Sequence, residues 1–195
     1  MIDKPEAEYV EYDFSPYTLP GDMLIAIGLV TTAAAQTEDM IQLAIAGCLG
    51  IDSEYGKATT LHMAMPLRIS VLKSSAEIKI DDLDVLDQLD ELIDEIERAF
   101  ERRNAIVHHQ WCTDIKTKQV FTSKEVARSS LRADLIPMTV AQVKEDALLI
   151  YTVGLKLFAF IQKHGLLPNH PPVRPRFHKT KPERKKRREA LLKSQ

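Results

Sequence analysis

The chain has 195 residues, of which 45% are hydrophobic, and this suits one folded domain with appendages better than two domains. Its apolar runs fall short of the roughly eighteen residues of a membrane span, and its N-terminus lacks the pattern of a secretory signal. We therefore expect a cytoplasmic protein without membrane contact. Two cysteines, Cys48 and Cys112, are too few for a disulfide framework or a zinc site.

Two helices are expected in the first half of the chain, after an extended N-terminal segment (1–21) that holds three prolines. The first helix spans about 22–49, where Asp22 can cap its start and Gly50 can end it. The second spans about 54–76 and contains Pro66. Because proline removes a backbone hydrogen bond and clashes with the preceding turn, we expect a kink or two shorter helices there.

The third expected helix, residues 82–107, has the clearest periodicity of the chain. Its apolar residues form two adjacent rows at helical spacing, which is typical of a helix packed in a bundle. The first row comprises Val85, Leu89, Leu92, Ile96 and Ala99, and the second comprises Leu86, Ile93, Phe100 and Val107. The opposite face is acidic, and three arginines near the C-terminal end suit the helix dipole.

The pattern changes over residues 110–136 and becomes helical again afterwards. Ile115, Val120 and Phe121 flank the polar segment 116–119, which is compatible with a short hairpin. A fourth helix is expected to start at Thr139, where Thr139 and Gln142 fit a capping box, and to stop at Gly165. The expected fold is all-α, an antiparallel four- to five-helix bundle (22–167) with a small hairpin insertion and an extended basic C-terminal tail.

Residues 168–195 form the expected Pro-rich linker and basic tail, in which a short basic helix can open at Pro182 and end near Leu192. From residue 173 onwards, ten Lys or Arg residues accompany two Asp or Glu residues, although the whole chain has 26 basic and 28 acidic residues. The body is therefore acidic and the tail basic. Such a tail is suited to nucleic acid or to an acidic partner, and it is equally compatible with a solvated end.

The segment that can carry chemistry is Arg103-Asn104-Ala105-Ile106-Val107-His108, at the end of the third helix. Arginine offers a fixed charge and a planar fork of donors for a phosphate, and histidine can move a proton near neutral pH. Residues five apart lie ~140° apart around an ideal helix, so Arg103 and His108 would not share one face. Either the helix loosens near His108, or a symmetric dimer brings one chain's arginine to the other's histidine and places two histidines in one cleft.

The pattern Arg-Asn-x-x-x-His at the end of a helix in an all-α bundle resembles the HEPN superfamily (higher eukaryotes and prokaryotes nucleotide-binding). The resemblance covers roughly residues 22–165 and places Arg103, Asn104 and His108 at the motif positions. It implies a metal-independent, dimeric endoribonuclease that cuts single-stranded RNA and leaves a cyclic phosphate. His108 would move protons, Arg103 would stabilise phosphoryl charge, and Asn104 would orient His108 or hold a phosphate. Some members of the superfamily serve only as binding modules.

Weaker RNA-binding candidates surround the motif and populate the tail. They are Arg102, His109, Lys116, Arg184, Lys185, Lys186, Arg187 and Arg188. Ordinary structural roles remain open beside these functions. Arg103 can simply end a helix and pair with Glu97 or Glu101, and Trp111 is better explained as a packing residue than as a base-stacking platform. The histidines are too scattered to predict a metal site, and no cofactor is expected.

Two hypotheses from different classes follow. The first is a homodimeric endoribonuclease that acts in prokaryotic defence or a toxin–antitoxin system, with RNA as substrate and an antitoxin or other defence protein as partner; this biological context depends on the resemblance alone. The second is a non-catalytic helical module that binds nucleic acid or an acidic partner through its basic tail.

Overall fold

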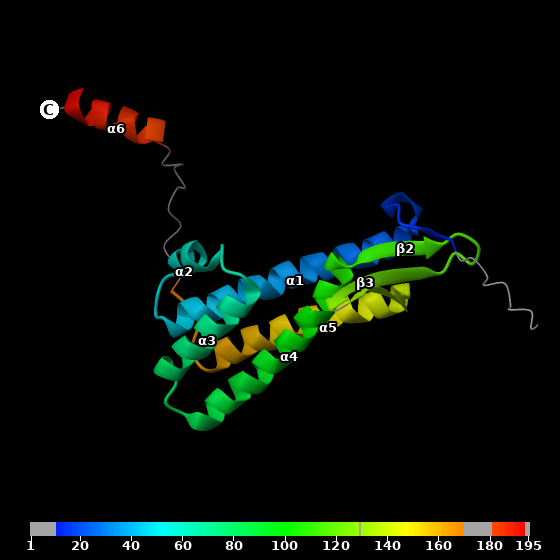
Figure 1. Ribbon diagram of the computed structural model, residues 1–195. Helices are drawn as coiled ribbons and strands as arrows, with labels where there is room; N and C mark the ends of the chain where they lie inside the picture. The colour runs from blue at the N-terminus through cyan, green and yellow to red at the C-terminus, as the bar shows by residue number, and fades with distance from the viewer. Residues whose placement is uncertain (1–10, 129, 170–180, 194–195) are drawn as a thin grey trace, which may run out of the picture.

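The computed structural model describes residues 11–128, 130–169 and 181–193. About 70% of the chain is helical, and a four-stranded antiparallel sheet is attached to the helices (Figure 1). The expectation that the fold is mainly helical is therefore confirmed. The expectation that the fold is all-α is wrong, because the segment 110–136 and part of the N-terminal segment pair as strands.

Helix α1 (Gly21–Cys48) and helix α5 (Val140–Lys163) form the most extensive helix–helix contact of the fold. Small residues let the two backbones come close. The hydroxyl of Thr37 donates to the carbonyl of Ile150 at 2.8 Å, and a Cβ added to Gly154 would lie 2.5 Å from that hydroxyl oxygen. The two helices run in the same direction (Figure 1), so the bundle is not antiparallel throughout.

The second expected helix is two helices, α2 (Ser53–Thr60) and α3 (Met65–Lys79), with Pro66 in the first turn of α3. Proline is tolerated at that position because the first backbone amides of a helix lack an internal partner. Arg68 is buried beside the break. It donates to the carboxylate of Glu38 on α1 at 2.6 Å and to the carbonyls of Thr60 and Leu61 at 3.2 and 3.1 Å.

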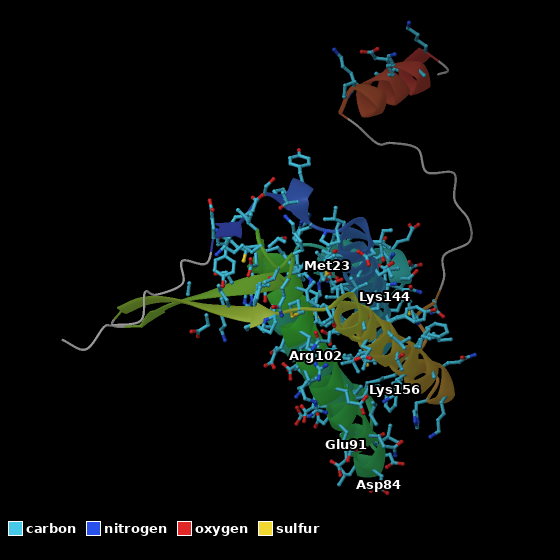
Figure 2. The ribbon with its side chains drawn as sticks, turned by 90° about the vertical axis from the view of Figure 1, so that its right-hand side faces the viewer. Met23, Asp84, Glu91, Arg102, Lys144 and Lys156 are labelled. Atoms are coloured by element: carbon cyan, nitrogen blue, oxygen red, sulfur yellow. The ribbon has the colours of Figure 1, made fainter. Side chains whose placement is uncertain are left out.

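Helix α4 (Leu83–His108) is capped by Asp82, whose carboxylate accepts hydrogen bonds from two free amides of the first turn. Its apolar stripe is buried against α1 and α5. Two ion pairs join α4 to α5 in antiparallel order: Arg102 with Asp146 at 2.8 Å, and Glu95 with Lys156 at 2.6 Å (Figure 2). The expected 82–107 helix is confirmed to within one residue.

The sheet has the strand order β1 (Tyr12–Asp13), β2 (Gln110–Asp114), β3 (Val120–Arg128) and β4 (Ser130–Pro137). The hairpin expected around 116–119 is confirmed as the connection between β2 and β3. Its turn is closed by Asp114, whose carboxylate accepts from the amides of Lys116 and Thr117. These hydrogen bonds lower the pKa of Asp114 below its ordinary value.

The helix ends and terminal segments expected from the sequence are confirmed in part. The capping box of Thr139 and Gln142 is present, and Gly50 and Gly165 take positive φ beyond the ends of α1 and α5. The expected basic helix is α6 (Lys181–Lys193). Of the expected extended segment 1–21, residues 1–10 lie outside the described residues, and 11–18 contain β1 and a short 3-10 helix. Residues 170–180 of the expected linker are also outside.

Candidate functional site

The motif occupies the last two turns of α4, where the chain passes almost directly into β2. His109 follows the helix with extended backbone angles (φ −75°, ψ 152°), and its amide still donates to Ala105 at 3.3 Å. The indole of Trp111 donates to the carbonyl of Ile106 at 2.8 Å. Because the last carbonyls of a helix have no internal partner, this bond anchors the end of α4 to the sheet. Trp111 packs against the core, which confirms its expected packing role.

Arg103 and His108 meet within one chain. The guanidinium nitrogen Nη1 of Arg103 lies 3.0 Å from Nε2 of His108. The helix remains intact through His108, so neither a loosened last turn nor a second subunit is needed to bring the two groups together. The argument from ~140° of separation fails because it considers Cα positions, whereas the long arginine side chain reaches around the helix.

The chemistry of the guanidinium limits the role of the imidazole in this contact. A guanidinium can donate hydrogen bonds but cannot accept them. In this contact, therefore, Nε2 of His108 can only act as the acceptor. An imidazole nitrogen in the acceptor role can also take a proton, and this one is held next to the group that would bind a phosphate.

Asn104 contacts Arg103 rather than His108. Its side-chain oxygen Oδ1 accepts from the same nitrogen, Nη1, at 3.1 Å. The expectation that Asn104 orients His108 directly is therefore not what the geometry displays; both residues are acceptors for one guanidinium nitrogen. Together they hold the arginine in place, and neither supplies a carboxylate to its guanidinium.

Arg103 retains unused donors. Its Nε is buried without a hydrogen-bond partner, and Nη2 forms no hydrogen bond within the described parts of the chain. It forms no ion pair with a described acid, so pairing with Glu97 or Glu101 is absent there. The neighbouring Arg102, a weaker RNA-binding candidate, is instead paired with Asp146 of α5. Since Nη2 is both unused and accessible, it is the donor that an incoming anion can reach, whereas Nε is enclosed by the protein.

The other sequence candidates are not gathered around this pair. Lys116 is exposed in the turn that follows β2, beyond the end of the strand that is farther from the motif. His109 adjoins the motif, and its Nδ1 is buried without a partner among the residues described. Lys185 and Lys186 are exposed on α6, whereas the side chains of Arg184, Arg187 and Arg188 fall outside the described residues.

Sequence reasoning missed two contributors to the site. One is the Trp111 indole that fastens the carbonyl of Ile106, and the other is Asp146, which occupies Arg102 and so separates the roles of two adjacent arginines. The available signal for the first was a lone tryptophan three residues after His108. No local signal identifies Asp146, because it reaches Arg102 from a different helix.

A metal cluster and a membrane-spanning helix are both absent from the described residues. They contain no cluster of three or more His, Cys, Asp or Glu residues arranged to hold a metal ion. None of the helices described there has the length and apolar character needed to cross a membrane. Comparison with family models, with curated proteins and with solved structures finds no match to this chain.

Proposed function

We propose that the protein is a metal-independent endoribonuclease of the HEPN kind that cleaves single-stranded RNA at the Arg103–His108 pair. One observation carries the proposal: a guanidinium with unpaired donors lies 3.0 Å from an imidazole nitrogen that presents its lone pair. A purely structural arginine would be expected to have satisfied donors, preferably through a carboxylate. The combination suits a phosphate next to a proton acceptor.

The proposed reaction begins when a phosphodiester binds Arg103 through the unused donors. The phosphate oxygens compete for the guanidinium and release Nε2 of His108, which then takes the proton of the adjacent ribose 2′-hydroxyl. The 2′-oxygen attacks phosphorus, the P–O5′ bond breaks, and the leaving 5′-oxygen takes a proton from water. The products are a 2′,3′-cyclic phosphate and a 5′-hydroxyl. Arg103 stabilises the charge that builds on the phosphoryl oxygens.

The experiment compares Arg103→Ala and His108→Ala with Arg98→Ala, a control that removes an exposed arginine one turn earlier on α4. Cleavage of single-stranded RNA is measured with EDTA present, and the products are analysed for a cyclic phosphate end. We expect each motif variant to lose about 10²–10³-fold in rate and the control to match the parent. Parent-like cleavage by folded Arg103→Ala and His108→Ala proteins would end the proposal.

The biological setting is proposed from the family resemblance alone: prokaryotic defence or a toxin–antitoxin system in the cytoplasm, with an antitoxin or other defence protein as partner. If the chain is such a toxin, its expression alone should arrest growth, and His108→Ala should relieve the arrest at equal protein level. Unimpaired growth with active parent protein in the cell would refute this setting without affecting the cleavage chemistry.

A second candidate function is binding without catalysis through the tail. The observation in its favour is α6, a helix of 13 residues with exposed lysines at 185 and 186. Such a helix attracts a phosphate backbone without reading sequence, and the affinity should fall steeply with salt. This function predicts that deleting 173–195 abolishes RNA binding while His108→Ala leaves it intact, and that no cleavage occurs.

A further inference from the structure

The segment that precedes α1 holds one aromatic ring out in solvent. Tyr17 is 94% exposed, more than any other large apolar side chain of the described residues. Among those residues, its ring meets no other aromatic ring and its hydroxyl forms no hydrogen bond. Tyr12 differs, because its ring packs edge-to-face on Phe121 with 5.7 Å between the ring centroids. The fold therefore uses the ring of Tyr12 and leaves that of Tyr17 available.

The turn that carries Tyr17 is held by local hydrogen bonds. It is the 3-10 helix η1 (Pro16–Thr18), with Pro16 at its first position and Ser15 as its cap. The Ser15 hydroxyl accepts from the amide of Tyr17 at 3.3 Å. The Ser15 carbonyl accepts from the hydroxyl and the amide of Thr18 at 2.8 and 3.2 Å. A ring on a turn fixed in this way loses little backbone freedom when it binds a ligand.

Strand pairing directs η1 toward the end of the sheet that bears the motif. β1 is antiparallel to β2, with Asp13 opposite Thr113. The chain that leaves β1 after Asp13 therefore runs back along β2 toward Gln110, which is two residues from His108. η1 contacts β2, and it appears in dark blue beside that strand in Figure 1. The displayed ring and the motif are thus on the same side of the turn that ends β2.

The charge of this segment suits a nucleic acid strand. Residues 14–20 carry no charged side chain, so they do not repel phosphates. The acid that precedes them, Asp13, accepts a hydrogen bond from the amide of Ser15 at 2.8 Å. Positive charge is supplied at the motif, where Arg103 keeps unused donors. Proteins that bind single-stranded nucleic acid combine cations that hold the backbone with aromatic rings on which bases stack.

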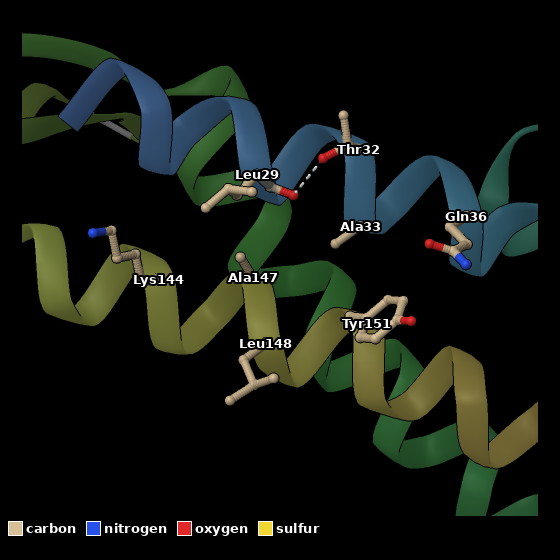
Figure 3. A pocket seen from close by; sticks show the side chains of 8 residues that line it. All are labelled: Leu29, Thr32, Ala33, Gln36, Lys144, Ala147, Leu148 and Tyr151. Atoms are coloured by element: carbon tan, nitrogen blue, oxygen red, sulfur yellow. Dashed lines mark hydrogen bonds between the residues drawn. The ribbon is translucent and has the colours of Figure 1, made fainter. Parts of the chain in front are cut away.

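Other exposed apolar side chains are less suited to a base. α1 has an exposed apolar face (Leu24, Ile25 and Leu29), which is aliphatic. Tyr151 lines a groove of about 310 Å³ between α1 and α5 (Figure 3), and at 38% exposed most of its surface is already covered. Tyr55 is 71% exposed, but it is on α2, beyond the far end of α1. The 28 residues of α1 span ~42 Å, so Tyr55 is remote from the motif.

We propose that Tyr17 is a stacking platform for a base of the single-stranded RNA whose phosphate is held by Arg103. The identity of this ligand rests on the proposed ribonuclease function. Stacking accepts every base, because each base has a π face, so the platform adds affinity without sequence preference. The ring holds the strand on the protein and takes no part in proton transfer.

Binding is measured with the full His108→Ala chain, which leaves RNA uncut, and a short fluorescent single-stranded RNA. In this background, Tyr17→Ala and Tyr17→Leu should raise the dissociation constant about 5- to 100-fold, which is the worth of one stacked base. Tyr17→Phe and Tyr17→Trp should bind like the unsubstituted ring, because both keep a π face. Tyr55→Ala is the matched control and should also leave binding unchanged. Circular dichroism establishes that each variant folds.

RNA with a missing base sharpens the test. In a series of oligonucleotides that each contain one abasic ribose, one position should weaken binding to the chain with Tyr17 but not to Tyr17→Ala, because both changes remove the same contact. In the chain that retains His108, Tyr17→Ala should raise KM for RNA and leave kcat within about twofold.

Three results would overturn the platform: no RNA binding, parent-like binding by Tyr17→Ala or Tyr17→Leu, or an abasic series without such a position. Parent-like binding by Tyr17→Leu would identify an apolar contact in place of stacking. If the parent cleaves RNA and Tyr17→Ala has the same KM, the platform fails and the ribonuclease stands. If the parent cleaves no RNA but Tyr17→Ala weakens binding as expected, the ribonuclease fails and the platform stands.

Discussion

Two arginines near helix ends, Arg68 and Arg103, are held in opposite ways. Arg68 is buried, and all three of its guanidinium nitrogens donate hydrogen bonds, one of them to the carboxylate of Glu38. Arg103 is half-buried, uses one nitrogen, and gives its hydrogen bonds to two neutral groups. All guanidinium nitrogens of Arg68 are therefore used within the fold, whereas Arg103 keeps nitrogens that can still donate to a ligand.

The difference teaches which arginine is available for a ligand. A guanidinium whose donors are all occupied would have to break existing hydrogen bonds in order to bind a phosphate. For Arg68, this would leave the carboxylate of Glu38 without its partner. A guanidinium whose charge is unpaired can accept a phosphate without first giving up an ion pair. The hydrogen bonds that each guanidinium forms therefore distinguish a structural arginine, Arg68, from one that is available to a ligand, Arg103.

The largest effect we expect is on stability, from Arg68→Ala. Removing this side chain leaves Glu38 without its partner and the carbonyl of Leu61 without this donor, whereas the carbonyl of Thr60 still accepts from the amide of Met63. We expect a loss of about 3 kcal/mol in the free energy of unfolding, at the low end for a broken buried pair because Glu38 keeps access to water. Arg103→Ala should change stability by less than about 1 kcal/mol. Urea unfolding of both variants measures the difference.

Equal destabilisation by the two substitutions would contradict this comparison. It would mean that the contacts of Arg103 with Asn104 and His108 stabilise the fold as strongly as the Glu38 network does. Arg98→Ala, an exposed position on α4, serves as the baseline for loss of an arginine that has no such contacts.

The second effect is on catalysis, from Arg103→Lys. Lysine keeps the charge but presents a compact ammonium, which cannot donate to Asn104, His108 and a phosphate from one fixed plane. We expect cleavage to fall about 10–100-fold, less than in Arg103→Ala, with unfolding unchanged. Measured rates at saturating RNA give the ratio. A lysine variant as active as the parent would show that charge alone suffices and that the planar fork has no role.

The sequence predicted the local parts of this architecture and missed the non-local ones. The helix bounds and the Thr139 capping box depend on residues within one or two turns, so their patterns are readable. The cap expected from Asp22 is wrong, because the first helix begins at Gly21 after Pro20 and has no side-chain cap. Strand β4 was missed because its identity comes from pairing with β3, and β1 because two residues carry no periodicity. The relative directions of the helices were only partly predicted. The break into α2 and α3 reverses the chain once more than a single kinked helix would, so α1 and α5 run in the same direction.

The candidate site follows the same rule. Arg103, Asn104 and His108 could be named from their spacing, but their mutual contact depends on side-chain reach, which spacing does not contain. The saturation of Arg68 required three elements to be placed in space. The apolar face of α1 was not predicted at all, because the helix is apolar around much of its circumference and the sequence does not indicate which part stays exposed.

A third and smaller effect is expected at the junction of α4 and the sheet. Trp111→Phe keeps an aromatic ring in the packing but removes the donor for the Ile106 carbonyl. We expect about 1 kcal/mol of lost stability and a modest decrease in cleavage, because the turn that bears His108 loses its tie to β2. Hydrogen exchange of amides 105–109 should speed up. Unchanged exchange there would show that packing alone holds the end of α4.

The smallest effect concerns Asp114. Its carboxylate accepts hydrogen bonds from two backbone amides, so it is satisfied within the fold in the same way as the guanidinium of Arg68. Its lowered pKa means that the folded state favours the charged carboxylate. The resulting stability is present above the ordinary value of 3.8 and is lost as the pH falls through the folded pKa. Asp114→Asn should therefore melt at a lower temperature than the parent at pH 7, and this difference in melting temperature should disappear as the pH drops below 3.8.

Cleavage at pH 7 should not change, since the turn lies at the far end of β2 from the motif. A gap that persists at pH 2 would show that the amide disturbs the turn by shape and not by loss of charge.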